Sequence, residues 1–279
     1  MLMRISYARE MKRAAILLLA FAWQMLPQSR TLKVEEYPSP MVRESQEVMV
    51  NGVVERWQLE WRGGPISYCG VADMPITCPC FGFAYGEAGM LDLVRYRGAG
   101  EIERLRLTTL FEDQFSGYGN TGISAIIQRW PFEPKDANLQ TLAQLLQKRK
   151  TVQVMHFADY NHDGSTTEFL LQTDTAPCGK EMCVAIGVSK LNPRLHVFGT
   201  AIAPRRPLQL ERGIWERFRE ATAPVETMAW GCWDHGSEVE EDVLLRATPQ
   251  GIDGKWREYS CPPQPRRLLK ESPLNRPLY

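Results

Sequence analysis

Short runs in which apolar and polar residues alternate recur along this chain and most strongly constrain its fold. Between Glu47 and Arg62 the apolar residues fall in two such runs, and Asn51-Gly52 between them is typical of a hairpin turn. Alternation predicts strands with one buried face and one face in water. Further strands are expected at 90–97, 102–110, 152–157, 168–172, 183–188, 196–200, 225–230, 242–247 and 256–261. Asp253-Gly254 is expected to turn the last two into a hairpin.

Two helices interrupt the predicted strands. The first is expected near 136–150, where Asp136 can cap the N-terminus and leucines recur along one face. The second is expected near 207–220, where apolar residues follow Leu210 at every fourth position. The predicted fold is therefore mainly β with two or three helices (α+β). We expect antiparallel sheets in a partial propeller-like or sandwich arrangement.

The N-terminus has the order of a secretory signal. Lys12-Arg13 precedes an apolar run, Ala14–Ala22, which is shorter than the roughly 20 residues that span a bilayer. Ala20-Phe21-Ala22 is an acceptable cleavage site. We expect export to the periplasm or the extracellular space and no membrane span after signal removal. The alternative is an N-terminal core helix.

The predicted organisation has five regions. These are a signal peptide at 1–22, a linker at 23–46, an N-terminal β-rich region at 47–130, a second β region with both helices at 131–261, and a flexible tail at 262–279. Prolines without apolar periodicity mark the linker and the tail.

Seven cysteines are expected to pair mostly with one another in an exported protein. Cys178 and Cys183 are close enough in sequence to bridge a tight turn. Cys232 and Cys261 flank a predicted strand pair and make a second candidate bridge. The remaining three leave one pair and one odd thiol, with the choice open: Cys69, Cys78 and Cys80.

The charge balance argues against partners that need a positive field. Lys plus Arg and Asp plus Glu both number 33, so the formal net charge is zero. Nonspecific binding to nucleic acid or to anionic membrane requires an excess of positive charge. We therefore expect no nucleic-acid partner.

One segment, residues 159–168, points to a particular chemistry. Asp159, Asn161 and Asp163 place oxygen-bearing side chains at positions 1, 3 and 5, and Gly164 at position 6 permits a sharp turn. A D-x-N-x-D-G loop of this kind gathers oxygens around a hard cation such as calcium.

The segment is not an EF-hand. Position 12 is Leu170 instead of a glutamate, and 152–157 upstream indicates a strand instead of a helix. Two alternatives stay open. One is a polar turn that holds no ion, and the other is a transition-metal set of His156, Asp159 and His162.

The order strand, D-x-N-x-D-G loop, strand resembles the calcium loops of bacterial VCBS and FG-GAP repeats over roughly residues 152–200. The resemblance implies a propeller blade or related sheet in an extracellular recognition module, with calcium in a structural role. It also implies a set of calcium ligands: the side chains of Asp159, Asn161 and Asp163, the Ser165 carbonyl, and Glu168. The family usually places its last carboxylate at position 9, here Thr167, so Glu168 stands one residue later.

No catalytic motif is evident. Cys232, Asp234 and His235 are adjacent in sequence, whereas a catalytic triad is assembled from distant segments. Our first hypothesis is an exported, disulfide-stabilised binding or cell-envelope module for an unknown protein or glycan ligand. The alternative is a secreted hydrolase with a divergent active site, and a third possibility is a purely structural envelope protein.

Overall fold

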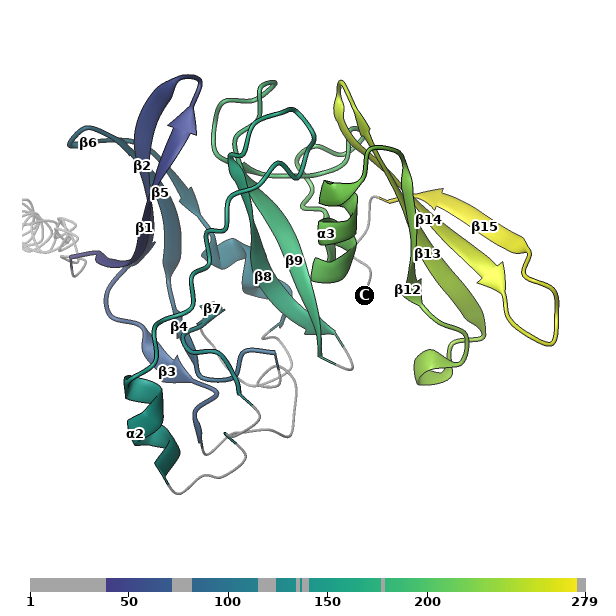
Figure 1. Ribbon diagram of the computed structural model, residues 1–279, viewed down its shortest axis with the longest axis horizontal. Helices are drawn as coiled ribbons and strands as arrows, with labels where there is room; N and C mark the ends of the chain where they lie inside the picture. The colour runs from purple at the N-terminus through teal and green to yellow at the C-terminus, as the bar shows by residue number, and fades with distance from the viewer. Residues whose placement is uncertain are drawn as a thin grey trace, which may run out of the picture. The chain divides into compact units, whose positions relative to one another are not determined.

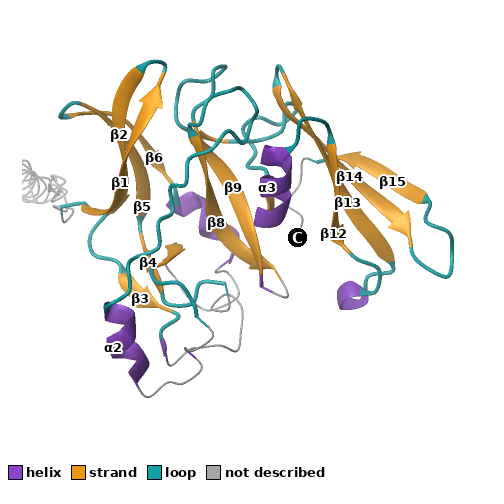
Figure 2. Cartoon of the chain, viewed as in Figure 1, coloured by secondary structure: helices purple, strands orange, loops and turns teal. Residues whose placement is uncertain are grey.

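The described part of the chain is mainly β with antiparallel sheets, as the alternating pattern predicted (Figure 2). The computed structural model describes residues 39–71, 82–114, 124–133, 136, 141–176 and 179–274, all within one compact unit, Pro38–Tyr279. The predicted signal peptide, residues 1–22, lies outside these residues. No helix among them is long and apolar enough to cross a bilayer.

The first sheet has the strand order β1-β2-β5-β6. Its strands are β1 (Met41–Val50), β2 (Val53–Trp61), β5 (Leu91–Arg97) and β6 (Gly100–Arg106), and the 3-10 helix η3 (Thr108–Gln114) follows. The predicted turn Asn51-Gly52 joins β1 to β2, and its two residues have φ values of 50° and 80°. Positive φ at both positions matches the twist of a two-residue hairpin.

The end of the predicted linker, 23–46, belongs to β1, so the linker prediction is wrong from Met41 onward. The first part of this strand, 41–46, shows no apolar alternation because charged side chains hold it in place. Arg43 forms a buried ion pair with Glu87. Ladder hydrogen bonds to β2 satisfy its backbone.

Residues 152–157, predicted to be a strand, form no β-ladder. The carboxylate of Glu44 takes the place of a partner strand. It accepts hydrogen bonds from the N–H groups of Val154 and Met155 at 2.7 and 3.0 Å. The chain here is therefore held by a side chain instead of a neighbouring strand.

Two further sheets follow in the chain. One contains β3 (Ile66–Tyr68), β4 (Gly86–Gly89) and β7 (Ala125–Gln128). The other contains β8 (Glu168–Ala176), β9 (Lys180–Gly187), β10 (His196–Val197) and β11 (Gln209–Glu211). In this sheet β9 pairs with β8, β10 and β11, so it is the strand on which the sheet is built.

The β8–β9 hairpin contributes to two hydrophobic cores. Phe169, Leu171, Val184 and Ile186 join the first core, together with residues of β2, β5 and β7. Leu170, Cys183 and Ala185 join the second core, with residues of α3 (Arg212–Glu220) and of β12 to β14. Successive residues of a strand point to opposite faces, so both faces of this hairpin are covered (Figure 1).

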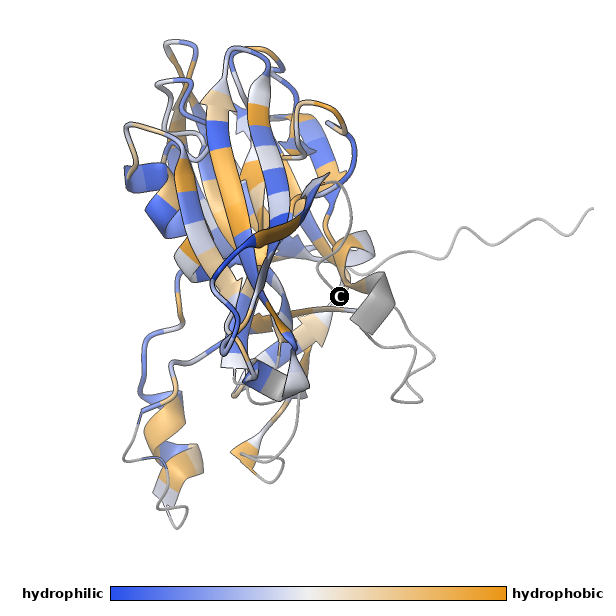
Figure 3. Ribbon diagram, turned by 90° about the vertical axis from the view of Figure 1, so that its right-hand side faces the viewer, coloured by the Kyte–Doolittle hydropathy of each residue, from blue (hydrophilic) through white to orange (hydrophobic). Residues whose placement is uncertain are grey.

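The last sheet has the order β12-β13-β14-β15. Its strands are β12 (Val225–Trp230), β13 (Val239–Thr248), β14 (Gly251–Ser260) and β15 (Leu268–Pro273), with a short 3-10 helix η7 (Asp234–Gly236) between the first two. Hydrophobic and hydrophilic bands alternate along the strands of the fold (Figure 3).

The predicted turn at Asp253-Gly254 is wrong, because β13 and β14 turn at residues 249–250. Gly254 lies inside β14 and contacts Leu274 closely. A Cβ at position 254 would lie 3.0 Å from the Leu274 side chain. Tertiary packing therefore needs this glycine within the strand, and the local turn preference is overridden.

The predicted flexible tail, 262–279, contains β15 and is therefore not an unpacked tail over 268–273. β15 pairs with the otherwise open edge of β14. Lys270 forms an ion pair with Glu258 at 2.8 Å, and Leu274 is buried. Residues 275–279 lie outside the described residues.

Both predicted helices are present but shorter. The helix α2 (Leu142–Gln147) occupies part of 136–150. Asp136 is not its cap, because its carboxylate accepts the Glu133 N–H at 2.8 Å and pairs with Arg149. A buried carboxylate next to a guanidinium gains more from this ion pair than from capping.

The second helix, α3, begins at Arg212 instead of near Pro207. The three residues before it form β11, which pairs with β9. The apolar pattern assigned residues 209–211 to the helix, but they form a strand because they pair with β9. Ile214 and Phe218 are buried against the second core, as the stripe predicted for the helix, and Trp215 is buried with them.

The cysteines divide into paired and free. Cys232 and Cys261 form a disulfide, as predicted, and Cys69 is also disulfide-bonded. The predicted Cys178–Cys183 bridge is wrong, because Cys183 is a free thiol buried in the second core. The apolar surroundings of β9 hold this side chain inward. Cys178 lies outside the described residues, as do Cys78 and Cys80.

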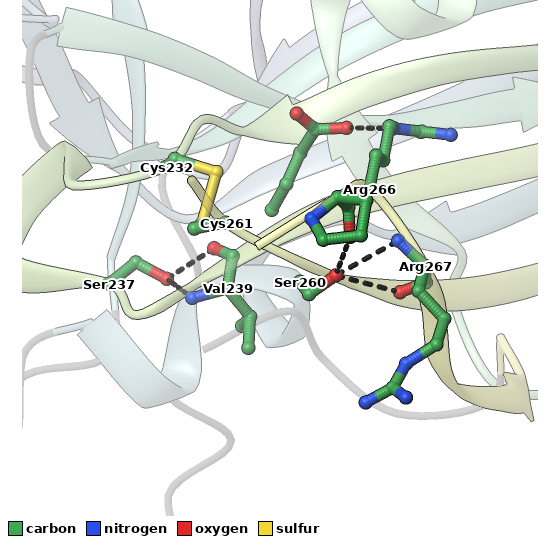
Figure 4. The surroundings of a disulfide bond; sticks show 9 residues. Cys232, Ser237, Val239, Ser260, Cys261, Arg266 and Arg267 are labelled. Carbon is green, nitrogen blue, oxygen red and sulfur yellow. Dashed lines mark hydrogen bonds and ion pairs between the residues drawn. A yellow bond between two sulfur atoms is a disulfide. The ribbon is translucent and has the colours of Figure 1, made fainter. Parts of the chain in front are cut away.

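The disulfide fastens the loop around η7 to the end of β14 (Figure 4). Ser237 Oγ donates a hydrogen bond to the Val239 carbonyl at 2.7 Å on one side of it. On the other side, the Ser260 N–H donates to the Arg267 carbonyl at 3.0 Å. The bridge therefore joins two segments that already have local partners.

We predict that replacing both cysteines, C232A with C261A, lowers the free energy of unfolding by about 3–4 kcal/mol. The bond closes a loop with a sequence separation of 29 residues, and its removal returns that loop's entropy to the unfolded chain. Urea unfolding of the variant and the wild type measures the difference. Equal unfolding midpoints would contradict the prediction.

Candidate functional site

A backbone pair closes the acidic loop that the sequence singled out. Ala158 and Glu168 exchange two hydrogen bonds, with N–H to carbonyl distances of 2.8 and 3.2 Å. Glu168 is also the first residue of β8. The intervening residues thus form a loop whose two ends are fixed to each other.

The loop turns where its sequence allows positive φ. His162 and Gly164 have φ values of 59° and 84°, at positions 4 and 6 of the motif. Asp159 holds the turn from within. Its carboxylate accepts the N–H of Asp163 at 3.1 Å and of Gly164 at 2.8 Å. The D-x-N-x-D-G pattern therefore dictates a compact turn that gathers its own side chains.

Asn161 and Asp163 complete the inner network. The Asn161 side-chain oxygen accepts the Asp163 N–H at 2.8 Å, and its amide donates to the Asp163 carboxylate at 3.2 Å. The Ser165 N–H donates to the same carboxylate at 2.9 Å. Four of the five predicted ligand residues are thus joined by hydrogen bonds.

Glu168, the fifth, is a fully buried carboxylate without an ion pair among the described residues. One of its oxygens accepts the Tyr160 N–H and the other accepts the Thr167 hydroxyl, each at 2.9 Å. Burial, together with the charges of Asp163 and Asp159, raises the pKa of Glu168 to about 8. The loop therefore combines three carboxylates, of which one is removed from water.

Lys190 supplies the positive charge beside the loop. Its backbone N–H donates to the Asp163 carboxylate at 2.7 Å, and its ammonium donates to the Asp163 carbonyl. The ammonium nitrogen lies 3.2 Å from the position of a Cβ on Gly164. Any cation bound by the loop would feel this charge.

The described residues contain no group of three or more His, Cys, Asp and Glu side chains arranged to hold a metal ion. The transition-metal alternative is not assembled either. The His162 side chain points away from the loop and contacts α3. Its Nε2 donates a hydrogen bond to the Phe218 carbonyl at 2.8 Å, and its ring contacts the Phe218 ring. His156 is exposed. The Cys232-Asp234-His235 alternative offers no nucleophile, because Cys232 is disulfide-bonded.

A large open cavity of about 1130 Å³ adjoins the loop. Residues 161–163 form part of its lining. The rest comes from segments that are distant in sequence, chiefly 189–192, 195–201 and 247–252. Leu195, Phe198 and Ile252 are buried and give the cavity apolar walls.

Sequence reasoning missed this cavity and the role of Lys190. The loop after β9 and the β13–β14 turn carry no motif, and only the fold brings them beside the acidic loop. The sole local signal was the loop itself. A cavity built from several segments that are far apart in sequence leaves no spacing pattern for a sequence to show.

We predict that Gly187→Ala destabilises the fold by about 1–3 kcal/mol through overpacking. Gly187 pairs with Glu168 across β8 and β9, and a Cβ there would lie 2.2 Å from the Thr167 carbonyl oxygen. Gly213→Ala is the matched control. Its Cβ would meet the nearest atom at 3.5 Å, and alanine favours the helix. Thermal unfolding of both variants tests this, and an unchanged G187A would contradict it.

We predict that Glu168 makes the metal-free protein less stable as the pH rises from about 4.5 to about 8. In this window the unfolded chain has lost the Glu168 proton while the folded protein still holds it, because burial raises the pKa. Urea unfolding at both pH values in metal-free buffer measures the loss.

Glu168→Gln, which cannot titrate, should reduce this pH dependence, whereas the exposed Glu47→Gln should leave it unchanged. An identical profile for the wild type and E168Q would show that Glu168 has an ordinary pKa.

Comparison with protein-family models, with curated proteins and with solved structures finds no match for this chain. The chain's own geometry therefore carries the functional argument.

Proposed function

We propose that this protein is an exported, disulfide-stabilised binding module in which residues 159–168 hold a structural calcium ion beside a ligand cavity. The acidic loop closed on the buried carboxylate of Glu168 is the observation that carries the proposal. The loop is proposed to be of the VCBS and FG-GAP type. Its role is to fix the entry to β8, not to perform chemistry.

The donor set supports a hard cation. Asp159, Asn161 and Asp163 offer side-chain oxygens, Ser165 offers its carbonyl, and Glu168 would close the set. These are oxygen ligands only, as calcium prefers, and three of them are carboxylates. A cation would lessen their mutual repulsion and the cost of burying the Glu168 charge.

The cavity supports a binding role over the hydrolase alternative. Among the described residues, Asp163 is the one carboxylate in its lining. Acid–base hydrolysis commonly uses a pair of titratable groups on opposite sides of the scissile bond. Apolar walls with a few polar groups are instead the general character of a ligand site.

Export and a sandwich-like arrangement belong to the same proposal. Disulfides persist in oxidising compartments, and the Cys232–Cys261 bridge together with the bonded Cys69 supports export. Burial of both faces of β8–β9 supports a layered arrangement in which this hairpin lies between two hydrophobic cores.

We predict that about 10 mM calcium stabilises the wild type by about 1.4–2.7 kcal/mol relative to EGTA, for dissociation constants of about 10⁻³ to 10⁻⁴ M. Asp159→Asn should abolish the effect by removing a ligand charge. Asp253→Asn, which changes an aspartate outside the loop, should retain it. Thermal unfolding with and without calcium is the measurement. Equal melting temperatures for the wild type in calcium and in EGTA would rule out the ion.

Lys190→Gln extends the same experiment. Removing the ammonium next to Asp163 removes a competing positive charge, so calcium should bind a few-fold more tightly. If calcium bound this variant more weakly, Lys190 would be part of the site's support instead of a competitor.

A further inference from the structure

We infer that the cavity beside the acidic loop binds a small amphipathic anion, with its acidic head group on the cationic side chains and its apolar body on the apolar part of the lining. The inference rests on the proposed binding function and names the class of ligand. The cavity has a volume of about 1130 Å³, slightly above the range of roughly 300–1,000 Å³ that is typical of small-molecule sites. The occupant can therefore be much larger than a single ion.

The charged residues of the lining are unbalanced. Among the described residues of the lining, Arg106, Lys190 and Arg205 contribute three positive charges and Asp163 one negative charge, so the difference is +2. The whole chain, by contrast, has a formal net charge of zero. Burial lowers the pKa of His196, which disfavours the charged form of that ring. An anion is the complement of this lining.

Two of the three cations have no internal partner. Among the described residues, the side chains of Arg106 and Arg205 make no ion pair and no hydrogen bond. Most other arginines of the sheets are paired, as Arg95 and Arg104 are with neighbouring carboxylates. The guanidinium groups at 106 and 205 are thus available to a ligand.

The third cation, Lys190, has a hydrogen-bond partner within the protein but keeps donors available for a ligand. The Lys190 ammonium donates to the Asp163 carbonyl, which leaves further N–H donors of the three that an ammonium carries. The Asp163 carboxylate is engaged by the N–H groups of Ser165 and Lys190. Its charge is therefore directed at backbone donors in the loop.

The apolar residues of the lining indicate that the ligand also has an apolar part. Leu105, Leu110 and Val197 line the cavity and are only partly buried, so each keeps some apolar surface accessible. The His196 ring lies against Phe198, with 4.3 Å between the ring centroids. A ligand without an apolar part would leave this apolar surface facing water, so a free inorganic anion fits less well.

The test titrates the full protein with decanoate and, separately, with decyl phosphate by isothermal calorimetry at low salt. Decyltrimethylammonium carries the same chain with the opposite charge and serves as the control ligand. Binding of either anion, weakened by added salt, is expected. The tighter of the two identifies the head group as carboxylate or phosphate.

Matched variants locate the head group. Arg205→Gln and Arg106→Gln should each weaken binding of the anion about two- to fivefold, as expected for exposed charges. Arg206→Gln is the control, because Arg206 is exposed, adjacent in sequence and absent from the lining. Lys190→Gln should weaken binding of the anion and strengthen binding of calcium. Unchanged circular dichroism verifies that the variants are folded.

Three outcomes would overturn the inference. The first is binding of decyltrimethylammonium as tightly as the anions, the second is an equal effect of R205Q and R206Q, and the third is that neither anion binds. If neither anion binds while calcium still raises the melting temperature, the anion site is wrong and the calcium proposal stands. If the anions bind and calcium has no effect on the melting temperature, the calcium proposal is wrong and the anion site stands.

Discussion

The β8–β9 hairpin is the element on which the rest of the fold depends, because both of its faces are buried. One face packs into the core shared with β2, β5 and β7, and the other into the core shared with α3 and β12 to β14. Each fully buried large apolar side chain stabilises by about 1.5–3 kcal/mol. Because the two cores meet at this hairpin, a change in its register would expose apolar residues on both sides at once.

The same burial sets the electrostatics of the acidic loop. The ladder pairs Glu168 with Gly187, which places the carboxylate inside without a basic partner. Glu55 is a useful contrast, since it is equally buried. There burial raises the pKa, but hydrogen bonds from Arg95 and Arg97 outweigh it and the pKa is lowered. Burying the charge of a glutamate without such partners destabilises the fold, and a bound cation would offset part of this desolvation penalty.

Much of the fold followed from local patterns, and the failures share one cause. The Asn51-Gly52 hairpin, most strands and the Cys232–Cys261 bridge were predicted, because alternation and turn chemistry act over a few residues. The start of α3, the turn at Asp253-Gly254 and the Cys178–Cys183 bridge were predicted wrongly. In each case a distant partner decided: β9 took β11 from the helix, Leu274 needed Gly254 in a strand, and the second core enclosed Cys183.

For the site, the sequence by itself determined the loop. The spacing of Asp159, Asn161, Asp163 and Gly164 is enough to form the turn, because its hydrogen bonds and positive φ values are local. Only the tertiary structure decided that Glu168 loses its water, that Lys190 stands beside Asp163, and that a cationic, apolar-walled cavity opens next to them. These depend on segments far apart in the chain, whose meeting is set by the burial of β8–β9.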